Sequence, residues 1–342
     1  MTDELPEIRK SHPYIMYDML KETPKALRTT LENVGNLNIE FKKRGVTVTG
    51  NGTSYHSGVL GFQFINRYEH PWNSYMGYEL EKYFEPYPNI VALSHTGKTF
   101  STLEAIRRHS DSNVIGITHY SDSPLAKESN IPVVINEKDR SLCNTKAFFD
   151  NVLASAIIAK KYAGEDYDFK GFIQIMEKTL EKADREMKSV VNEIDGIKNI
   201  FVLGAGNNFI AARETAQKLK EATHIHSEGI ELEEYNHGCT SVTDNGTLLI
   251  IISGHSDRQR TEQIVAGIHH VKAKALTING AGDFEIYPDT RNDFEFPIQA
   301  IAYTYYFAYH MAEKLNINPD ILRFDEKEYY DFDMAVFPPG HH

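Results

Sequence analysis

The sequence has little of several features that would define a class of protein. Its 342 residues include two cysteines, Cys143 and Cys239, which lie far apart and outside any CxxC pattern. Neither a disulfide framework nor a thiolate metal site is therefore expected. No apolar run approaches the roughly 18 residues that span a bilayer, and the N-terminus lacks the order of a signal peptide. We expect a cytoplasmic protein with no membrane partner.

Positive charge is also scarce. The 48 acidic residues outnumber the 36 lysines and arginines, and the formal net charge is -12. A nucleic-acid partner would have to be met by a concentrated basic face, so the charge balance argues against one. A small anionic substrate remains compatible with this charge, because a local nest of backbone amides can bind an anion whatever the net charge of the molecule.

The chain is long enough for two domains, and its pattern repeats. From about residue 45, short β-branched runs alternate with longer amphipathic ones, as in a parallel sheet with crossover helices. The expected strands lie at 46–50, 90–94 and 113–120 in the first half and at 200–204, 248–253 and 275–280 in the second. Because strand, glycine-containing turn and helix recur in the same order, we predict a duplicated α/β unit.

This organisation predicts five segments. They are an N-terminal helical segment (1–39), a first α/β domain (40–168), a connecting helix (169–195), a second α/β domain (196–320) and a C-terminal tail (321–342). Each domain is expected to be a parallel sheet between two layers of helices, as in flavodoxin-like folds.

Two turns of the first half are rich in hydroxyl groups where a strand ends and a helix begins. They are Gly50–Ser54 and Ser94–Thr99. Free amides of a first helical turn attract an anion, glycine lets the backbone approach it, and hydroxyls complete its oxygen shell. The alternative is that these serines and threonines only cap their helices.

Nucleotide-binding motifs are incomplete in this sequence. Gly97-Lys98-Thr99 resembles the end of a P-loop, but Ala92 stands where that motif needs its first glycine. Gly204-Ala205-Gly206 begins a dinucleotide fingerprint in which Phe209 replaces the third glycine. Neither pattern predicts a nucleotide cofactor.

Five short motifs point to one family when they are taken together. They are Gly52-Thr53-Ser54-Tyr55-His56, Ser94 to Thr99, Asn144-Thr145-Lys146-Ala147-Phe148, Lys218-Leu219-Lys220-Glu221 and Glu234-Tyr235-Asn236-His237-Gly238. In this order they resemble the isomerase half of glucosamine-6-phosphate synthase and the archaeal-type glucosamine-6-phosphate deaminases. That family consists of two tandem sugar isomerase (SIS) domains, and the resemblance runs from about residue 40 to 330.

The resemblance implies that the first domain binds a phosphosugar. The phosphate would be held by Ser54, Ser94, Thr96 and Thr99, with His95 in the same loop, and the sugar would be contacted by Thr53, Asn144 and Thr145. His95 and Lys98 stand where the family usually has Gln and Glu, and Asn144 replaces a Ser, so the resemblance leaves the substrate open.

The resemblance places the chemistry in the second domain. Glu221 would move a proton between C1 and C2 of the sugar, and His237 would assist ring opening, often across the interface of a homodimer, which we expect here. Glu214 and Lys218 also occupy family positions, and at i, i+4 and i+7 the three side chains share one helix face. A solvated face of ion pairs is the alternative for such a stripe.

One tail residue completes the predicted catalytic set. Arg323-Phe324-Asp325-Glu326-Lys327 matches a family pattern in which the lysine forms a Schiff base with the ketose. A nucleophilic lysine must be partly neutral, so we expect Lys327 to be desolvated or to lie near another cation. A solvated lysine is the alternative.

No cofactor is expected, and His224, His226 and His237 are a poor zinc signature without a positioned carboxylate. Because the resemblance covers only the isomerase half, we expect no glutaminase activity. The first functional hypothesis is an isomerase and deaminase acting on glucosamine 6-phosphate and fructose 6-phosphate. The alternatives are a fructosamine-6-phosphate deglycase, which would need a partner such as Lys98 or Arg323 for an amino-acid carboxylate, and a non-catalytic phosphosugar-binding regulator.

Overall fold

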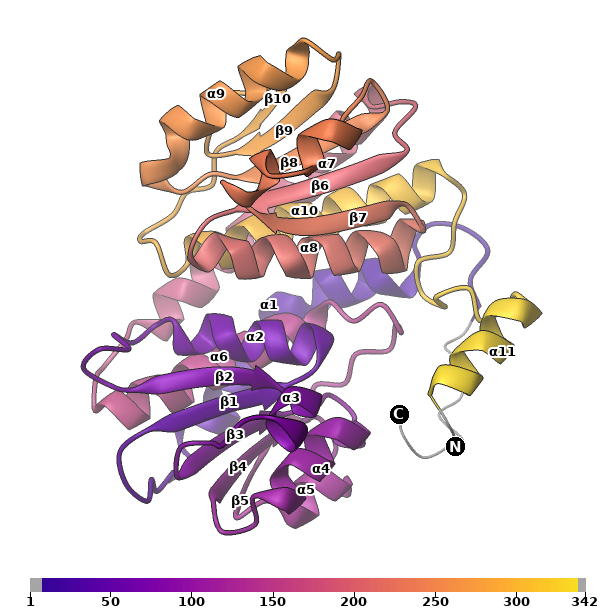
Figure 1. The fold of residues 1–342 in the computed structure, drawn as a ribbon. Coiled ribbons are helices and arrows are strands. Elements are labelled where there is room, and N and C mark those ends of the chain that lie inside the picture. The colour runs from indigo at the N-terminus through magenta and orange to yellow at the C-terminus, as the bar shows by residue number, and fades with distance from the viewer. Residues whose placement is uncertain (1–7, 338–342) are drawn as a thin grey trace. The chain divides into compact units, whose positions relative to one another are not determined.

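The computed structural model describes residues 8–337, and within this range the strands form two separate five-stranded parallel sheets (Figure 1). Two compact units contain these sheets. Unit 1 comprises residue 8, residues 18–173 and residues 321–337, and unit 2 comprises residues 9–17 and 174–320. The prediction of a duplicated α/β fold is confirmed. The first seven and last five residues, at the ends of the predicted N-terminal segment and tail, lie outside the described range.

Unit 1 has the strand order β2-β1-β3-β4-β5. The sheet's central strands are fully buried, as expected of parallel strands covered on both faces. Its elements are α1 (Ile15–Gly35, which begins in unit 2), β1 (Val46–Gly50), α2 (Gly52–Phe62), β2 (Trp72–Met76), α3 (Gly77–Lys82), β3 (Asn89–Leu93), α4 (Phe100–Arg108), β4 (Asn113–Thr118), α5 (Pro124–Glu128), β5 (Ile131–Val134), α6 (Lys146–Ala163) and α11 (Lys327–Val336).

The two faces of this first sheet are covered by different helices. Leu103 and Ile106 of α4 and Leu125 of α5 form one core cluster with buried residues of β3 and β4. Helices α2 and α6 pack against each other, and α2 also contacts β1 (Figure 1). The sequence therefore folds into three layers because its strands are apolar on both sides and its helices are apolar on one.

Unit 2 repeats this order as β10-β9-β8-β6-β7. Helix α9 covers one face through Ile264, Val265 and Ile268, and α8 packs against α10. The elements are α7 (Phe169–Glu193, which begins in unit 1), β6 (Asn199–Gly204), α8 (Asn207–Thr223), β7 (His226–Glu231), the 3-10 turns η1 (Glu234–Asn236) and η2 (Cys239–Val242), β8 (Thr247–Ile252), η3 (His255–Asp257), α9 (Arg258–His269), β9 (Lys274–Ile278), β10 (Phe284–Ile286) and α10 (Phe296–Lys314).

The unit boundary falls inside α7, at Ile173, within the segment that the sequence assigns to a connecting helix. The start of α1 belongs to unit 2, where the buried Asp320 carboxylate accepts the backbone N–H of Ile15 and of Met16 at 2.8 and 2.7 Å. Among residues 8–337, no helix combines the length and the apolar content that crossing a membrane requires.

Candidate functional site

The two hydroxyl-rich turns lie side by side at the switch point of the first sheet. Strands β1 and β3 are neighbours, but the chain leaves β1 for β2 on one side and continues from β3 to β4 on the other, so their carboxyl ends are the place where open α/β sheets usually bind ligands. Asn51, which precedes α2, donates to Ser101 Oγ at 2.9 Å and to Thr102 Oγ1 at 3.0 Å in the first turn of α4. The two helices therefore begin next to each other.

The capping alternative for these turns is not what the structure shows. The N-cap residues of α2 and α4 are Asn51 and Thr99, and within the described residues neither side chain accepts a hydrogen bond from the first turn of its helix. By contrast, Ser123 caps the neighbouring helix α5 through the N–H of Ala126. The first-turn amides of α2 and α4 thus lack the usual side-chain cap, as an anion-binding site requires.

The loop from Ser94 to Thr99 is held in one shape. Ser94 is buried, and its Oγ lies 2.8 Å from Thr99 Oγ1. The N–H of Lys98 donates to Thr96 Oγ1 at 3.3 Å. Gly97 has a φ of +66°, and a Cβ built there would lie 2.2 Å from Ser123 Oγ, so this position requires glycine. Thr53 and Ser54 stand half-buried in the first turn of α2.

His95 ties this loop to the turn that precedes α6. Its Nε2 accepts the backbone N–H of Asp139 at 3.2 Å, so the ring is neutral with its proton on Nδ1. Burial, reinforced by Lys146 and Lys138, lowers the pKa of His95 to about 4. The Asp139 carboxylate in turn accepts the N–H of Thr145 at 2.7 Å. This network orders the Asn144–Thr145 turn.

Two buried side-chain oxygens of this turn accept no hydrogen bond from the described residues. Within the described residues, Asn144 Oδ1 and Thr145 Oγ1 are buried and have no hydrogen-bond partner. A buried oxygen left unsatisfied costs about 1–3 kcal/mol, so such atoms are usually satisfied by a ligand or by ordered water. They are the two residues that the resemblance assigns to sugar contacts.

In unit 2, α8 brings three predicted catalytic side chains together. Lys218 is 1% exposed, and its ammonium lies 2.7 Å from Glu221 Oε2 and 4.0 Å from Glu214 Oε1. Glu214 is fully buried, whereas the Glu221 side chain is 24% exposed and also accepts Gln217 Nε2 at 2.9 Å. The row is therefore a buried charge cluster with one accessible carboxylate, and not a solvated stripe of ion pairs.

Sequence reasoning missed the residue that completes this cluster. Tyr305 of α10 donates its hydroxyl proton to Glu214 Oε1 at 2.6 Å, and its ring lies 5.6 Å from Lys218 Nζ. Tyr305 is fully buried in an apolar helix, so its pattern indicates only a core position. A phenol among apolar residues is the one signal that could have suggested a polar partner.

The other two predicted catalytic residues lie elsewhere in their units. His237 ends η1 in unit 2 and is exposed. Lys327 begins α11, and its side chain is 82% exposed and paired with Asp331. The expectation that Lys327 is desolvated is therefore wrong for this structure.

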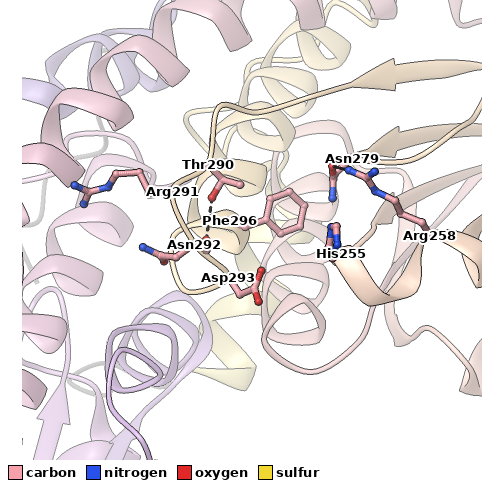
Figure 2. A pocket seen from close by; sticks show the side chains of 8 residues that line it. All are labelled: His255, Arg258, Asn279, Thr290, Arg291, Asn292, Asp293 and Phe296. Atoms are coloured by element: carbon pink, nitrogen blue, oxygen red, sulfur yellow. Dashed lines mark hydrogen bonds between the residues drawn. The ribbon is translucent and has the colours of Figure 1, made fainter.

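A shallow pocket lies at the carboxyl end of the second sheet (Figure 2). Its volume is about 230 Å³, and Figure 2 shows Phe296 between the Asn279 and His255 side and the segment from Thr290 to Asp293. Arg258 donates to Asn279 Oδ1 at 2.7 Å. The neighbouring Asp257 carboxylate accepts the N–H of Gly254 at 3.0 Å, so an acid of the same loop already binds this amide.

One group in unit 1 brings together side chains of the metal-binding types. Glu69, His70 and Glu165 have ligand atoms within 4.8 Å of one another. Glu165 already pairs with Lys160 at 2.7 Å and with His70 at 3.3 Å, and both acids are exposed. This is the geometry of a surface ion-pair network, and it carries no metal assignment.

Comparison with known proteins matches part of the chain to one protein family. The SIS domain family matches residues 193–312. The SIS match is therefore to a part of the chain that lies in its second half. Unit 2 contains the matched residues, and unit 1 has the same strand order, so the fold is a tandem pair of SIS-type units.

Curated relatives match the chain along most of its length. A glutamine–fructose-6-phosphate aminotransferase (isomerizing) of Sulfolobus acidocaldarius is 26% identical over 335 residues, which are 91% of this chain and 56% of that protein. The chain thus spans little more than half the length of this curated relative.

Solved structures share the whole fold. The C-terminal domain of glucosamine-fructose-6-phosphate aminotransferase from Francisella tularensis superposes with a TM-score of 0.77 at 21% identity, covering 90% of this chain and 98% of that domain. A glucosamine-6-phosphate deaminase from Thermotoga maritima gives a TM-score of 0.76 at 21% identity, covering 90% of this chain and 95% of that protein.

Proposed function

We propose that this protein is an enzyme that isomerises and deaminates glucosamine 6-phosphate. In the forward direction, glucosamine 6-phosphate and water give fructose 6-phosphate and ammonia, and ample ammonia reverses the reaction. The observation that carries the proposal is the buried row of Glu214, Lys218 and Glu221, in which only Glu221 is accessible. Related proteins named for these sugar phosphates support the substrate class.

Unit 1 would hold the phosphate. The uncapped first turns of α2 and α4 offer amides and hydroxyls, including those of Ser54, Ser94, Thr96 and Thr99, to the anion. The unsatisfied oxygens of Asn144 and Thr145 would accept hydrogen bonds from sugar hydroxyls, and such bonds would offset the cost of burying these atoms. Neutral His95 would add one N–H donor from Nδ1.

Unit 2 would move the proton. Conversion of an aldose to a ketose removes the proton at C2 and returns it at C1, and one carboxylate can serve both carbons. Lys218 Nζ lies 2.7 Å from Glu221 Oε2 and would orient the carboxylate that accepts the proton. Hydrolysis of the resulting C2 imine then releases ammonia. Lys327 is left out of this chemistry, because its exposed ammonium is paired with Asp331.

His237 would assist ring opening, since imidazole exchanges protons near neutral pH. Its exposed position at the end of η1 suits a residue that acts on a substrate held by a second copy of the chain. The proposal therefore includes a homodimer in which each active site draws on both subunits.

The test is to incubate the purified protein with glucosamine 6-phosphate and to measure ammonia and fructose 6-phosphate together. Equal amounts of both products are expected. Glu221→Gln should abolish turnover and leave fructose 6-phosphate binding intact, because the amide keeps the shape but cannot take the proton. Glu262→Gln, which changes an exposed acid on α9, is the matched control. Full turnover by Glu221→Gln would refute the assignment of the base.

A deglycase is the second candidate, and Lys98 is the observation that favours it. This partly exposed lysine stands in the phosphate loop, where a cation could receive the carboxylate of an amino-acid adduct. If glucosamine 6-phosphate gives no product, fructosamine 6-phosphates are the substrates to assay. Release of a free amino acid would then identify the deglycase, and binding without turnover would identify a regulator.

A further inference from the structure

The hydrogen bond from Tyr305 to Glu214 joins two helices of unit 2 at the candidate catalytic cluster. Tyr305 lies on α10 and Glu214 on α8, 91 positions apart in the sequence, and both are fully buried. The hydroxyl lies 2.6 Å from Glu214 Oε1, which is also the oxygen 4.0 Å from Lys218 Nζ. One carboxylate oxygen therefore links the phenol to the ammonium.

This arrangement places Tyr305 and Lys218 on the same carboxylate of Glu214. A buried carboxylate stays ionised only where donors and cations compensate for its lost hydration. Without the phenol, Glu214 would take up a proton more readily. Lys218, at 1% exposure, would then lose the negative charge of Glu214, which together with Glu221 flanks its ammonium.

We infer that Tyr305 is a positioning residue, which holds Glu214 ionised and thereby fixes Lys218 and the base Glu221 in their working arrangement. It acts through Glu214, and its expected contacts are with the cluster and not with the substrate. The catalytic part of this inference rests on the proposed function. The electrostatic part stands on the geometry of the cluster alone.

The chain offers a matched control on the same helix. Tyr303 is also fully buried, and within the described residues its hydroxyl has no hydrogen-bond partner. Tyr303→Phe and Tyr305→Phe each delete one buried hydroxyl and keep the ring. In Tyr305→Phe the ring next to Lys218 is retained, so the substitution isolates the hydrogen bond.

The kinetic test is a double-mutant cycle with Glu214→Gln. Loss of a hydrogen bond to a buried charge should lower the kcat of Tyr305→Phe by about tenfold or more, with KM nearly unchanged. The double variant should be no slower than Glu214→Gln alone, because Tyr305 acts through that carboxylate. Tyr303→Phe should match the wild type. Additive losses, or equal losses in the two tyrosine variants, would overturn the inference.

A second measurement separates this inference from the proposed function. Carbon-13 NMR of glutamate-labelled protein follows the carboxyl signals of Glu214 and Glu221 through a pH titration, with Glu214→Gln providing the assignment. In Tyr305→Phe the Glu214 signal should titrate at higher pH than in the wild type or in Tyr303→Phe. If no sugar phosphate is turned over but this shift occurs, the proposed function fails and the coupling stands. An unchanged titration refutes the coupling whatever the activity.

Discussion

Replacing His119 with glutamine should make the free energy of unfolding of unit 1 decrease less steeply as the pH falls. The side chain of His119 is fully buried, its Nδ1 lies 2.6 Å from the carbonyl oxygen of Glu137, and its ring centroid lies 4.6 Å from that of His95. Burial, with a further contribution from His95, lowers the pKa of His119 from 6.5 to about 3. The folded chain therefore keeps this ring neutral at a pH where the unfolded chain protonates it.

The direction of this pH effect on stability follows from the number of protons bound in each state. Between pH 6.5 and about 3 the unfolded state binds a proton at His119 that the folded state does not, so acid favours unfolding in this window. The stabilisation is complete above pH 6.5 and is lost as the pH falls. Each pH unit in this window changes the free energy of unfolding by about 1.4 kcal/mol, which gives roughly 3 kcal/mol between pH 6.5 and 4.5.

His95, with its pKa lowered to about 4, acts in the same direction as His119, whereas two buried carboxyls act in the opposite direction. Burial raises the pKa of Asp139 and of Asp150, so these carboxyls bind protons in the folded state first and oppose acid unfolding. Because both acids are present in the wild type and in His119→Gln, their contributions cancel in the difference between the two stability curves. The prediction therefore concerns that difference and not the acid stability of the wild type.

One tryptophan makes the assay specific to unit 1. Trp72 of β2 is the single tryptophan of the chain, is 6% exposed and packs on Phe62, so its fluorescence follows the unfolding of this unit. Urea unfolding of both proteins at intervals from pH 7 to 4.5 gives the two curves. They should converge as the pH falls, because the wild type alone loses the His119 contribution. Parallel curves would show that the ring is not held neutral.

Two further substitutions test the phosphate loop and the shared active site. Gly97→Ala should weaken fructose 6-phosphate binding, measured by calorimetry, at least about tenfold, because its Cβ would collide with Ser123. Gly164→Ala is the control, since Gly164 has a similar φ of +69° but open space around it. This control should lower the free energy of unfolding by the backbone strain of about 1–2 kcal/mol and leave binding unchanged. Tight binding by Gly97→Ala would contradict the loop assignment. If each site uses Glu221 of one subunit and His237 of the other, mixing inactive Glu221→Gln and His237→Ala dimers should restore about a quarter of wild-type activity. After exchange about half of the dimers would contain one subunit of each kind, and one of the two sites in such a dimer would have both residues intact. No recovery after exchange of subunits would place His237 in the same subunit as its base.

The central strands of both sheets could be predicted from the sequence because they are apolar on both faces. The run at 248–253 lies within one residue of β8, and the run at 46–50 coincides with β1. All four edge strands, β2, β5, β7 and β10, were missed. Trp72–Met76 and His226–Glu231 are partly exposed and mix aromatic, polar and charged residues, so neither alternation nor a continuous apolar run marks them.

The candidate site was predictable where its residues share one element. Spacing alone places Glu214, Lys218 and Glu221 on one face of α8, and the structure brings their charged groups together. The sequence could not indicate which helix would cover that face. Tyr305 reaches Glu214 only through the packing of α10 on α8, a contact between distant segments that no local pattern describes.

The two units differ at equivalent loops of their sheets, and this difference bears on which unit would bind the phosphate. At the switch point of the first sheet, the loop after β3 leaves the N-terminus of α4 without a side-chain cap. At the equivalent place in the second sheet, after β8, the Asp257 carboxylate accepts the Gly254 N–H, and a Cβ on Gly254 would lie 2.6 Å from that carboxylate. In the second loop the Asp257 carboxylate thus takes the Gly254 amide that an anion could otherwise bind, although Arg258 and Arg291 line the pocket beside it. We therefore keep the proposed phosphate site in unit 1, where the N-cap side chain of α4 takes no first-turn amide, and the proposed catalytic side chains on α8 of unit 2.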